Sequence, residues 1–266
     1  MGDFENSVLS FLSDRFPDAE SAFKGGFCVF SCPGGDVSTV AVPVVSETLE
    51  DAERQAERLE CEVRKLRDEG RTVVILPEDI WRSRRKMIQH RLLAQLGVFR
   101  SVFARNTEVR RIDKATSSEF FTDCHTYRDA SARYRYGLFD RQGSLVAAAS
   151  FSGTRVWDKP EGKVSSCEWV RYASLPDVRV VGGMGKVLKA FISEAGPDNV
   201  MSYADLEWTD GAVYERLGFK MESARCPVAF AVDRCSYERV PLKYASSLKN
   251  PLFHINRGSI KYRLLV

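Results

Sequence analysis

The 266-residue sequence has little histidine, no long apolar run and no regular spacing of cysteines. Without a run of 18 apolar residues, a conventional membrane-spanning helix is excluded. The first residues carry Asp3, Glu5 and Asp14 around a short apolar helix, where a signal peptide has positive charge. We therefore expect a cytoplasmic protein that has no membrane partner.

The seven cysteines are an odd number scattered over the chain, which is typical of reduced thiols and not of a disulfide framework. Cys28 and Cys32 are closely spaced, but no second pair follows them at zinc-site spacing. Histidine occurs only at His90, His125 and His254, so we expect no metal site. The net charge of +3 does not by itself indicate a nucleic-acid partner.

Helical and strand patterns alternate over residues 1–100, which predicts a small α/β domain. Ser46 is the candidate cap of a long charged helix, whose apolar residues recur at helical spacing until Gly70 ends it. The expected elements are a helix at 3–15, a hairpin of strands 26–31 and 37–45, a helix at 46–69, a strand at 72–76 and a helix at 79–96.

Strand and helix patterns also alternate over residues 107–266 and predict a second domain, so the whole chain belongs to the α/β (α+β) class. Two of its strands form a clear hairpin around the turn Asp140-Arg-Gln-Gly143. The expected strands are 108–112, 134–140, 144–152, 165–175, 199–205, 227–233 and 260–265, and the expected helices are 115–124, a helix ending near 196, and 210–217.

A glycine-rich segment, Val180-Val-Gly-Gly-Met-Gly-Lys-Val-Leu188, lies between a strand and a helix. Backbone amides at a helix N-terminus, together with the helix dipole, favour an anion such as a pyrophosphate. Glycine at Gly183 and Gly185 lets the backbone approach such a ligand closely. The alternative is an ordinary strand-to-helix turn without a ligand.

A second segment, Asp210-Gly-Ala-Val-Tyr-Glu-Arg-Leu-Gly-Phe219, reads as a short helix that ends at Gly218. Together, the two segments resemble the GNAT acetyltransferase superfamily, whose phosphate turn reads Gln/Arg-x-x-Gly-x-Gly/Ala and whose later helix commonly reads Tyr-Glu-Lys-Leu-Gly-Phe. Val180 departs from this pattern at the Gln/Arg position, with Arg179 one place earlier.

The resemblance implies a mixed, mostly antiparallel sheet flanked by helices for residues 107–266. It also implies an acyl-CoA co-substrate, acetyl-CoA or another, and an amine acceptor. It places Tyr214 where the family has the general acid that protonates the departing thiolate. The cofactor contacts that it implies are Ala173, Arg179, Val181, Gly182, Gly183, Met184, Gly185 and Lys186. An ordinary core or surface tyrosine is the alternative for Tyr214.

Glu168 lies in the strand that, in the family, splays from its neighbour and precedes the glycine turn. Some members carry a general base there, because an ammonium nucleophile must lose its proton before it attacks a thioester. Pairing with Arg171, or simple exposure to solvent, is the alternative. The aromatic and acidic residues Tyr203, Trp169, Trp208, Asp205 and Glu207 are further candidates for the acceptor site, although core or loop positions would explain them equally well.

The first hundred residues carry a fainter resemblance. The stretch Leu66–Trp81 and the basic helix after it look like part of phage homing-endonuclease-like proteins, in which a Vsr-like, PD-(D/E)XK-type nuclease domain is followed by a GNAT-like half. Such nucleases hold a divalent cation with paired carboxylates. Here Asp36 falls in a turn and Glu47 at a helix start, so we expect a degenerate, inactive nuclease-like domain.

The basic residues of the helix after Trp81 are the candidates for contact with nucleic acid: Arg82, Arg84, Arg85, Lys86 and Arg91. A solvated or internally paired face is the other interpretation. The leading hypothesis for the chain is a GNAT-type N-acyltransferase that moves an acyl group from acyl-CoA to an amine. The alternative is a nucleic-acid-binding or DNA-modifying protein of phage or mobile-element origin, with a GNAT-like scaffold.

Overall fold

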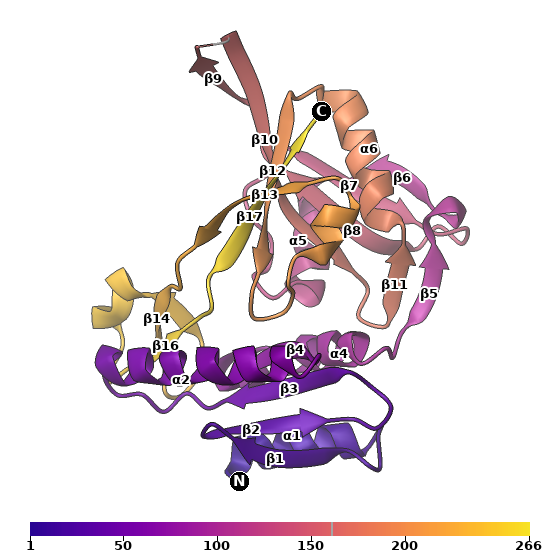
Figure 1. Cartoon of the computed structure of the whole chain (residues 1–266). Helices are drawn as coiled ribbons and strands as arrows, with labels where there is room; N and C mark the ends of the chain where they lie inside the picture. Colours follow the sequence, from indigo (N-terminus) through magenta and orange to yellow (C-terminus); the bar gives the residue numbers. More distant parts are fainter. Residues whose placement is uncertain (161) are drawn as a thin grey trace. The chain divides into compact units, whose positions relative to one another are not determined.

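A computed structural model describes residues 1–160 and 162–266, and these residues form two compact units (Figure 1). Unit 1 contains Met1–Leu96, Asp205–Asp210 and Ala224–Ser259, whereas unit 2 contains Gly97–Ala204, Gly211–Ser223 and Ile260–Val266. The segments 205–210 and 224–259, which we expected within the range 107–266, thus belong with the N-terminal residues. Among the described residues, no helix is long and apolar enough to cross a membrane.

Unit 1 is built on a four-stranded sheet with the strand order β1-β2-β3-β4. The strands are β1 (Glu20–Lys24), β2 (Phe27–Ser31), β3 (Val37–Val42) and β4 (Thr72–Pro77). The hairpin β2-β3 is antiparallel, as expected, whereas β3 and β4 are parallel. Because parallel neighbours need a crossover, the helix α2 (Leu49–Asp68) connects them.

Helix α2 covers one face of this sheet with its apolar stripe, in which Leu59, Val63 and Leu66 are buried. Its N-cap is Thr48, whose side chain accepts a hydrogen bond of 3.1 Å from the amide of Asp51. The expectation that Ser46 caps this helix was wrong, because the helix begins only at Leu49. The Ser46 carbonyl accepts a hydrogen bond from the amide of Phe253.

The other face of the sheet is covered by α1 (Asp3–Ser13), α3 (Glu78–Ser83) and α4 (Arg85–Gln95), which share one core cluster. Trp81 lies in this cluster, and its indole N–H donates to Ser7 Oγ at 2.8 Å. The single helix expected at 79–96 is two helices, because Arg84 between them has φ −129° and ψ 32°, which is not helical.

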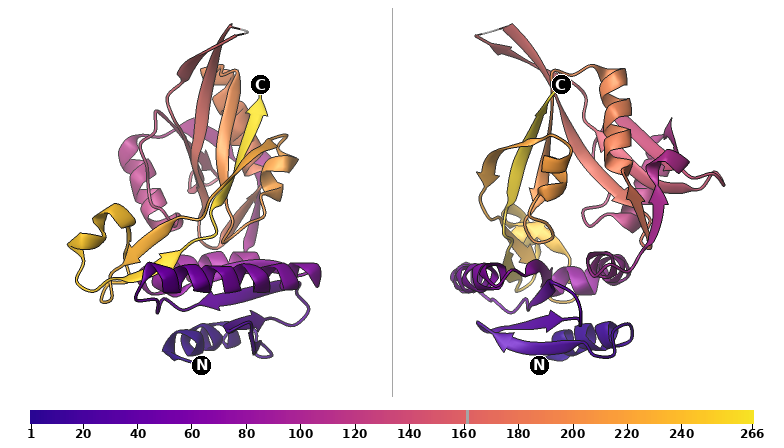
Figure 2. Two further views of the ribbon diagram at one scale, coloured as in Figure 1. Left: turned by 60° about the vertical axis from the view of Figure 1, so that its left-hand side comes forward. Right: turned by 45° about the vertical axis from the view of Figure 1, so that its right-hand side comes forward.

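The late segments of unit 1 complete its fold. They contribute the sheet β15-β14-β16 and a 3₁₀ helix: β14 (Ala229–Val232), β15 (Arg239–Pro241), η2 (Leu242–Ser247) and β16 (Leu252–Ile255). β16 runs beside α2 in both views of Figure 2. In addition, the amide of Ile75 on β4 donates to the carbonyl of Glu207 at 2.7 Å. Segments from late in the chain thus supply hydrogen bonds and core residues to the N-terminal sheet.

Unit 2 is built on an eight-stranded sheet with the order β13-β17-β12-β10-β8-β7-β6 and with β9 paired to β10. The strands β6, β7, β8, β9 and β10 pair with one another in antiparallel fashion, whereas β10 and β12 are parallel. This confirms the expected mixed, mostly antiparallel sheet flanked by helices. Its strands are β6 (Glu108–Arg111), β7 (Tyr134–Phe139), β8 (Leu145–Phe151), β9 (Arg155–Lys159), β10 (Gly162–Ser174), β12 (Asn199–Asp205), β13 (Lys220–Arg225) and β17 (Ser259–Leu265).

Helices cover both faces of this sheet. The alanines of β8 show this, because Ala147 and Ala149 pack in the same cluster as Phe191 of α6 (Gly183–Ala195), whereas Ala148 packs with Phe121 of α5 (Lys114–Cys124). Neighbouring residues of a strand point to opposite faces. Helices α5 and α6 therefore lie on opposite faces of the sheet.

The remaining elements of unit 2 frame the start of α6. The parallel strands β5 (Arg100–Phe103) and β11 (Val178–Val181) form a separate small sheet. The 3₁₀ helix η1 (Ala104–Asn106) follows β5 in the sequence. The helix α7 (Ala212–Arg216) stands near the 210–217 range expected from the sequence. Neither β5 nor β11 was expected, since each is only four residues long.

Candidate functional site

The glycine-rich turn leads from β11 directly into α6. Gly182 is the N-cap in the left-handed region, with φ 78°, and the first intrahelical bond joins the amide of Lys186 to the Gly182 carbonyl at 3.1 Å. The amides of Gly183, Met184 and Gly185 precede that bond and have no acceptor within the helix. They form the kind of positive helix end that binds a phosphate.

The two motif glycines are needed for different reasons. A Cβ on Gly183 would lie 2.6 Å from the Tyr172 hydroxyl and 2.8 Å from Val180 Cγ1, so packing alone requires glycine there. At Gly185, the nearest atom to an added Cβ is Leu217 Cδ2 at 3.4 Å. Because packing constrains Gly185 much less, it is the better position at which to test a ligand.

Basic side chains near the turn differ in their partners. The Lys186 ammonium donates to the backbone carbonyls of Ala104, at 2.8 Å, and Thr107. It therefore binds the segment 104–107, which follows β5. Arg179 stacks on Phe99, with its guanidinium carbon 4.0 Å from the ring centroid. Burial lowers the pKa of Arg179, and the like charge of Arg216 lowers it further. Two guanidinium groups within electrostatic reach of each other are a favourable setting for an anion.

Two further residues implied as cofactor contacts lie in different settings. Val181 is exposed at the end of β11, next to the turn. Ala173 is buried between β10 and α5, and it pairs with Ala148 on β8. Its side chain therefore packs in the core on the α5 face of the sheet, opposite the face covered by α6.

Strands β10 and β12 separate in the middle of the sheet. Their parallel pairing runs only from Ser166 with Asn199 to Glu168 with Met201, although both strands continue. On the other edge of β10, the register with β8 shifts between Trp169 and Arg171, which is a bulge. The splayed strand that the family resemblance implies is thus present at the expected place.

Tyr214 lies at this separation. Its hydroxyl is 3.0 Å from Ser202 Oγ and 3.4 Å from the carbonyl of Tyr203, both on β12. Ser202 Oγ is also 3.0 Å from the carbonyl of Trp169 on β10. The Tyr214 hydroxyl is therefore linked through one serine to both of the diverging strands, and burial raises its pKa, so that it keeps its proton at neutral pH.

Ser202 was not among the residues singled out in the sequence. Its signal is the alternation along β12, where Val200, Ser202 and Ala204 are buried in turn. A serine on the apolar face of a strand needs a hydrogen-bonding partner. Such a position can be found from the pattern, but its partner on another element cannot.

Glu168 occupies the last paired position before the strands separate. Its backbone is bound on both sides by Ser152, whose hydroxyl accepts from the Glu168 amide at 2.9 Å and whose amide donates to the Glu168 carbonyl at 2.9 Å. Burial lowers the pKa of Arg171, and the nearby carboxylate of Glu168 offsets part of that effect. The side chain is half-buried and lies within electrostatic reach of that guanidinium group.

Of the three aromatic candidates for the acceptor site, Trp169 and Trp208 are core residues and Tyr203 is half-buried. Trp169 is 3% exposed and stacks on Phe151 with ring centroids 5.2 Å apart. Trp208 is 2% exposed within the core of unit 1, where Arg91 lies 4.2 Å from its ring centroid. For both tryptophans the core interpretation holds.

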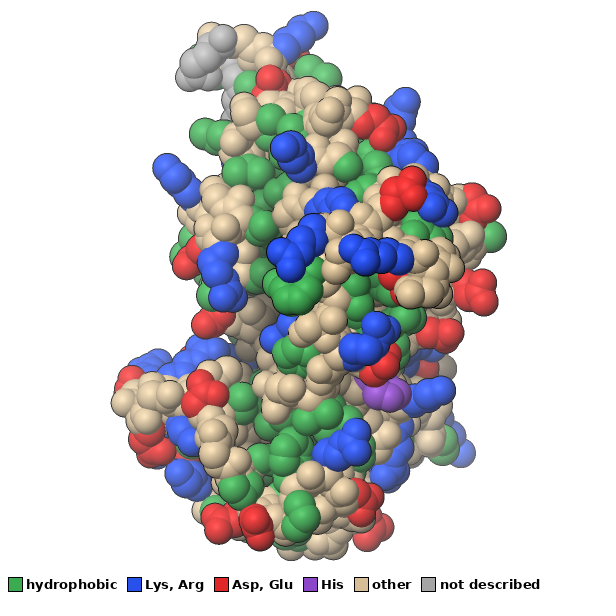
Figure 3. Space-filling view, turned by 90° about the vertical axis from the view of Figure 1, so that its right-hand side faces the viewer, with side chains coloured by type: hydrophobic (Ala, Val, Ile, Leu, Met, Phe, Trp, Pro, Cys, Tyr) green, Lys and Arg blue, Asp and Glu red, His purple; other side chains and the backbone are tan. Residues whose placement is uncertain are grey.

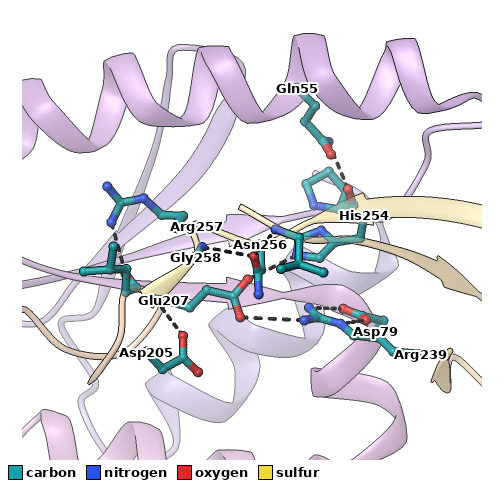
Figure 4. A network of polar contacts seen from close by, with 12 residues as sticks. Gln55, Asp79, Asp205, Glu207, Arg239, His254, Asn256, Arg257 and Gly258 are labelled. Carbon is teal, nitrogen blue, oxygen red and sulfur yellow. Dashed lines mark hydrogen bonds and ion pairs between the residues drawn. The ribbon is translucent and has the colours of Figure 1, made fainter. Parts of the chain in front are cut away.

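The acidic candidates also have structural roles. Asp205 accepts from the amide of Glu207 at 3.0 Å. Glu207 is buried in unit 1 and pairs with His254 at 3.1 Å, in the network of Figure 4. Asp79, which is fully buried, binds the guanidinium group of Arg239, and that group also lies 3.7 Å from Glu207. Burial raises the pKa of Asp79, but the Arg239 charge outweighs this and leaves it lowered.

This buried network joins segments that are far apart in the sequence. Asp79 follows β4, Glu207 belongs to the 205–210 segment, and Arg239 and His254 lie on β15 and β16. A buried ion pair is weak evidence for net stability, but losing one partner leaves an uncompensated charge. The network therefore ties the late segments to the first sheet.

The basic helix residues are partly engaged within unit 1. Arg82 pairs with Glu78 at 2.7 Å and stacks over Tyr237, and Arg85 lies over the ring of Trp81. Lys86 is exposed. On the face shown in Figure 3, Lys and Arg side chains are dispersed among apolar and polar ones and do not form one continuous basic surface. Contact with nucleic acid stays a prediction.

The carboxylates considered for nuclease chemistry lie in separate places. Asp36 accepts from the Thr72 hydroxyl at 2.9 Å, and Glu47 pairs with Arg234 at 2.9 Å on the surface. Within residues 1–160 and 162–266, no group of three or more His, Cys, Asp or Glu side chains is arranged to hold a metal ion. Both acids thus have local structural partners.

No protein-family model matches the sequence, and no curated protein matches it. Among solved structures, a Bacillus subtilis acetyltransferase in complex with CoA is similar to this chain at 13% identity and a TM-score of 0.38, over 60% of this chain and 99% of the other. Spermidine/spermine N-acetyltransferase from Vibrio cholerae is 12% identical, with a TM-score of 0.37, over 61% and 94%.

The ribosomal-protein-S18-alanine N-acetyltransferase of Escherichia coli is 13% identical, with a TM-score of 0.39, over 60% of this chain and 94% of the other. Likenesses at these values assign neither a family nor a site residue to this chain.

Proposed function

We propose that unit 2 is an acyl-CoA-dependent N-acyltransferase that moves an acyl group from the thioester to an amine. In this proposal, the amides of Gly183, Met184 and Gly185 hold the pyrophosphate, with Arg179 beside them. Tyr214 is the general acid and Glu168 the general base. The motif resemblance to the GNAT superfamily and the acetyltransferases among the similar structures agree with this chemistry.

The position of the Tyr214 hydroxyl is the observation that best supports the proposal. It lies where β10 and β12 part, 3.0 Å from Ser202 Oγ, and burial keeps it protonated. Where parallel strands separate, their facing backbone groups are no longer used by one another and can bind an extended ligand. A proton donor at that point suits a thiolate leaving group.

The residues of this chain would divide the proton transfers. Glu168, on β10 at the start of the separation, would take the proton of an ammonium acceptor so that its nitrogen lone pair can attack the acyl carbon. When the carbon–sulfur bond breaks and sulfur takes the electron pair, Tyr214 would supply the proton. Ser202 would then hold the Tyr214 oxygen in place through its hydrogen bond.

Calorimetric titration with acetyl-CoA tests the cofactor site. We expect binding to the wild type, no binding to Gly185→Leu, and about tenfold weaker binding to Arg179→Gln through loss of one charged contact. Lys189→Gln is the matched control, because Lys189 is an exposed cation on the same helix. Its affinity should equal that of the wild type.

Two results would overturn the proposal. The first is the absence of acetyl-CoA binding to the folded wild type, and the second is unchanged affinity in the Gly185 variant. Duplex-DNA binding that weakens steeply with salt, without affinity for CoA, would favour the nucleic-acid alternative instead.

A further inference from the structure

A row of polar side chains crosses three strands on the α5 face of the unit 2 sheet. Arg135 on β7 is paired with Ser150 on β8, and Ser150 is paired in turn with Arg171 on β10. Residues that face each other across antiparallel strands point to the same side. Since Ala148, two residues from Ser150, packs against α5, the whole row lies on the α5 side.

A pocket of about 460 Å³ opens beside this row. It is lined by Arg135, by Lys114 and Ser118 from the first turns of α5, and by the loop 129–132, which contributes Asp129 and Ser131. Lys114 and Arg135 carry positive charge and Asp129 negative charge, so the lining has an excess of one positive charge. Hydroxyl groups supply the remaining polar lining.

Within residues 1–160 and 162–266, two residues that line the pocket carry a buried polar atom without a hydrogen-bonding partner: Arg135, at Nε, and Asp129, at Oδ1. The same holds for Ser150 Oγ in the row and for Ser117 Oγ on α5. Arg135 is only 9% exposed, and its guanidinium group donates to the carbonyl of Ala132. Because buried polar groups are almost always satisfied, an incompletely bonded guanidinium group at a pocket wall is a favourable setting for a polar ligand.

The lining side chains define what would bind. The Arg135 guanidinium group and the Lys114 ammonium put two cations at the pocket wall, which together suit an oxyanion. The Asp129 carboxylate is an acceptor, and it would repel a fully deprotonated oxyanion. A ligand that offers anionic oxygens on one side and an O–H on the other would satisfy both.

We propose that this pocket is a binding site for a phosphate-type oxyanion that keeps one O–H group, such as a monoprotonated phosphate or phosphate monoester. Arg135 and Lys114 hold the anionic oxygens, and Asp129 accepts from the O–H. The site is separate from the glycine turn at α6, because α5 and α6 cover opposite faces of the sheet. It does not depend on the proposed transfer reaction.

Competition between inorganic phosphate and sulfate tests this assignment, because phosphate retains an O–H near neutral pH and sulfate does not. Binding to the full-length protein is measured by calorimetry at constant ionic strength. We expect phosphate to bind at least about tenfold more tightly than sulfate, the effect of one charge-assisted hydrogen bond. Asp129→Asn should remove most of this preference, since an amide can donate to sulfate.

Variants of the cations give a second measurement. Arg135→Gln should weaken phosphate binding about tenfold or more, and Lys114→Gln by a few-fold, as expected for an exposed charge. Lys189→Gln is the control and should not change the affinity. Should Arg135→Gln fail to fold, Ser131→Glu replaces it, because Ser131 is exposed and a carboxylate there should abolish phosphate binding.

Three outcomes would overturn the assignment. One is the absence of phosphate binding to the wild type. Another is equal affinity for phosphate and sulfate. The third is an equal loss of affinity in the Lys114 and Lys189 variants, which would indicate general charge attraction and not a built site.

Discussion

Replacing Tyr214 by phenylalanine removes one oxygen atom from the point where β10 and β12 separate. Phenylalanine keeps the stacking on Tyr262, at 5.3 Å between ring centroids, and the edge contact with Phe219 at 5.6 Å. Two hydrogen bonds are lost, at 3.0 Å to Ser202 Oγ and 3.4 Å to the Tyr203 carbonyl. Ser202 keeps its bond to the carbonyl of Trp169.

The expected cost in stability is small. A net contribution of about 1 kcal/mol applies to the shorter hydrogen bond, and the longer one adds little. The expected cost in turnover is larger, because loss of a general acid slows a reaction by about 10²-fold or more, or about 2.7 kcal/mol in the barrier. The two effects are therefore separable in one variant.

The assay measures release of the CoA thiol from acetyl-CoA with a set of primary amines, alongside calorimetric affinity for acetyl-CoA and thermal unfolding. Tyr214→Phe should lower kcat about 100-fold, with nearly unchanged cofactor affinity. Tyr262→Phe is the matched control: its ring stacks on Tyr214, its hydroxyl lies 3.4 Å from Glu215, and its kcat should change little. Equal turnover in Tyr214→Phe and wild type would refute the role of Tyr214 as general acid, as would a wild type that binds acetyl-CoA but releases no thiol.

The remaining predictions concern stability, pH and cleavage. Asp79→Asn should lower the free energy of unfolding, measured with urea, by about 3–5 kcal/mol, because the buried Arg239 loses its charged partner. Glu47→Gln, at an exposed ion pair, should lower it by at most about 1 kcal/mol. Equal losses would contradict the buried network. Hydrogen bonds from Arg263, and then Lys261, lower the pKa of Glu222 to about 2, so its stabilisation is present above the unfolded pKa of about 4.3 and is lost as the pH falls toward 2. The free energy of unfolding, measured with urea, should therefore fall less steeply at acidic pH in Glu222→Gln than in the wild type, by a small amount since the group is partly exposed. The same pH dependence in both proteins would contradict this. No Mg²⁺- or Mn²⁺-dependent cleavage of plasmid DNA is expected, and cleavage that disappears in Asp36→Ala would show that a metal-binding carboxylate was overlooked.

Periodicity predicted the elements whose apolar residues face one core. Helix α2 and the hairpin β2-β3 are examples, because their patterns are long and bounded by turn residues. The short strands β5 and β11 were missed, since four residues carry little periodic signal. The predicted helix 79–96 is broken at Arg84, because the sequence pattern does not reveal that one residue has a non-helical backbone conformation.

In the candidate site, too, some residues could be predicted from the sequence and others could not. Local motifs predicted Tyr214 and the turn at Gly183, because a helix start and its glycines are neighbours in sequence. The partner of Tyr214, Ser202, lies on a different element, and the contact depends on how β12 packs against α7. Likewise, Arg135 and Arg171 are 36 positions apart and share a row only because of strand register. Such relations come from tertiary structure.

The division of the chain between its units has a consequence for synthesis on the ribosome. Unit 1 begins at Met1, yet its core is closed by the segments 205–210 and 224–259. At about 5–20 residues per second, the stretch between residues 96 and 259 takes roughly 10–30 s to emerge. During this interval Asp79 and the edge of β4 must wait for partners that have not yet been made. The first sheet to be translated is therefore among the last parts of the protein to be completed, and chaperones have time to bind its exposed apolar surface.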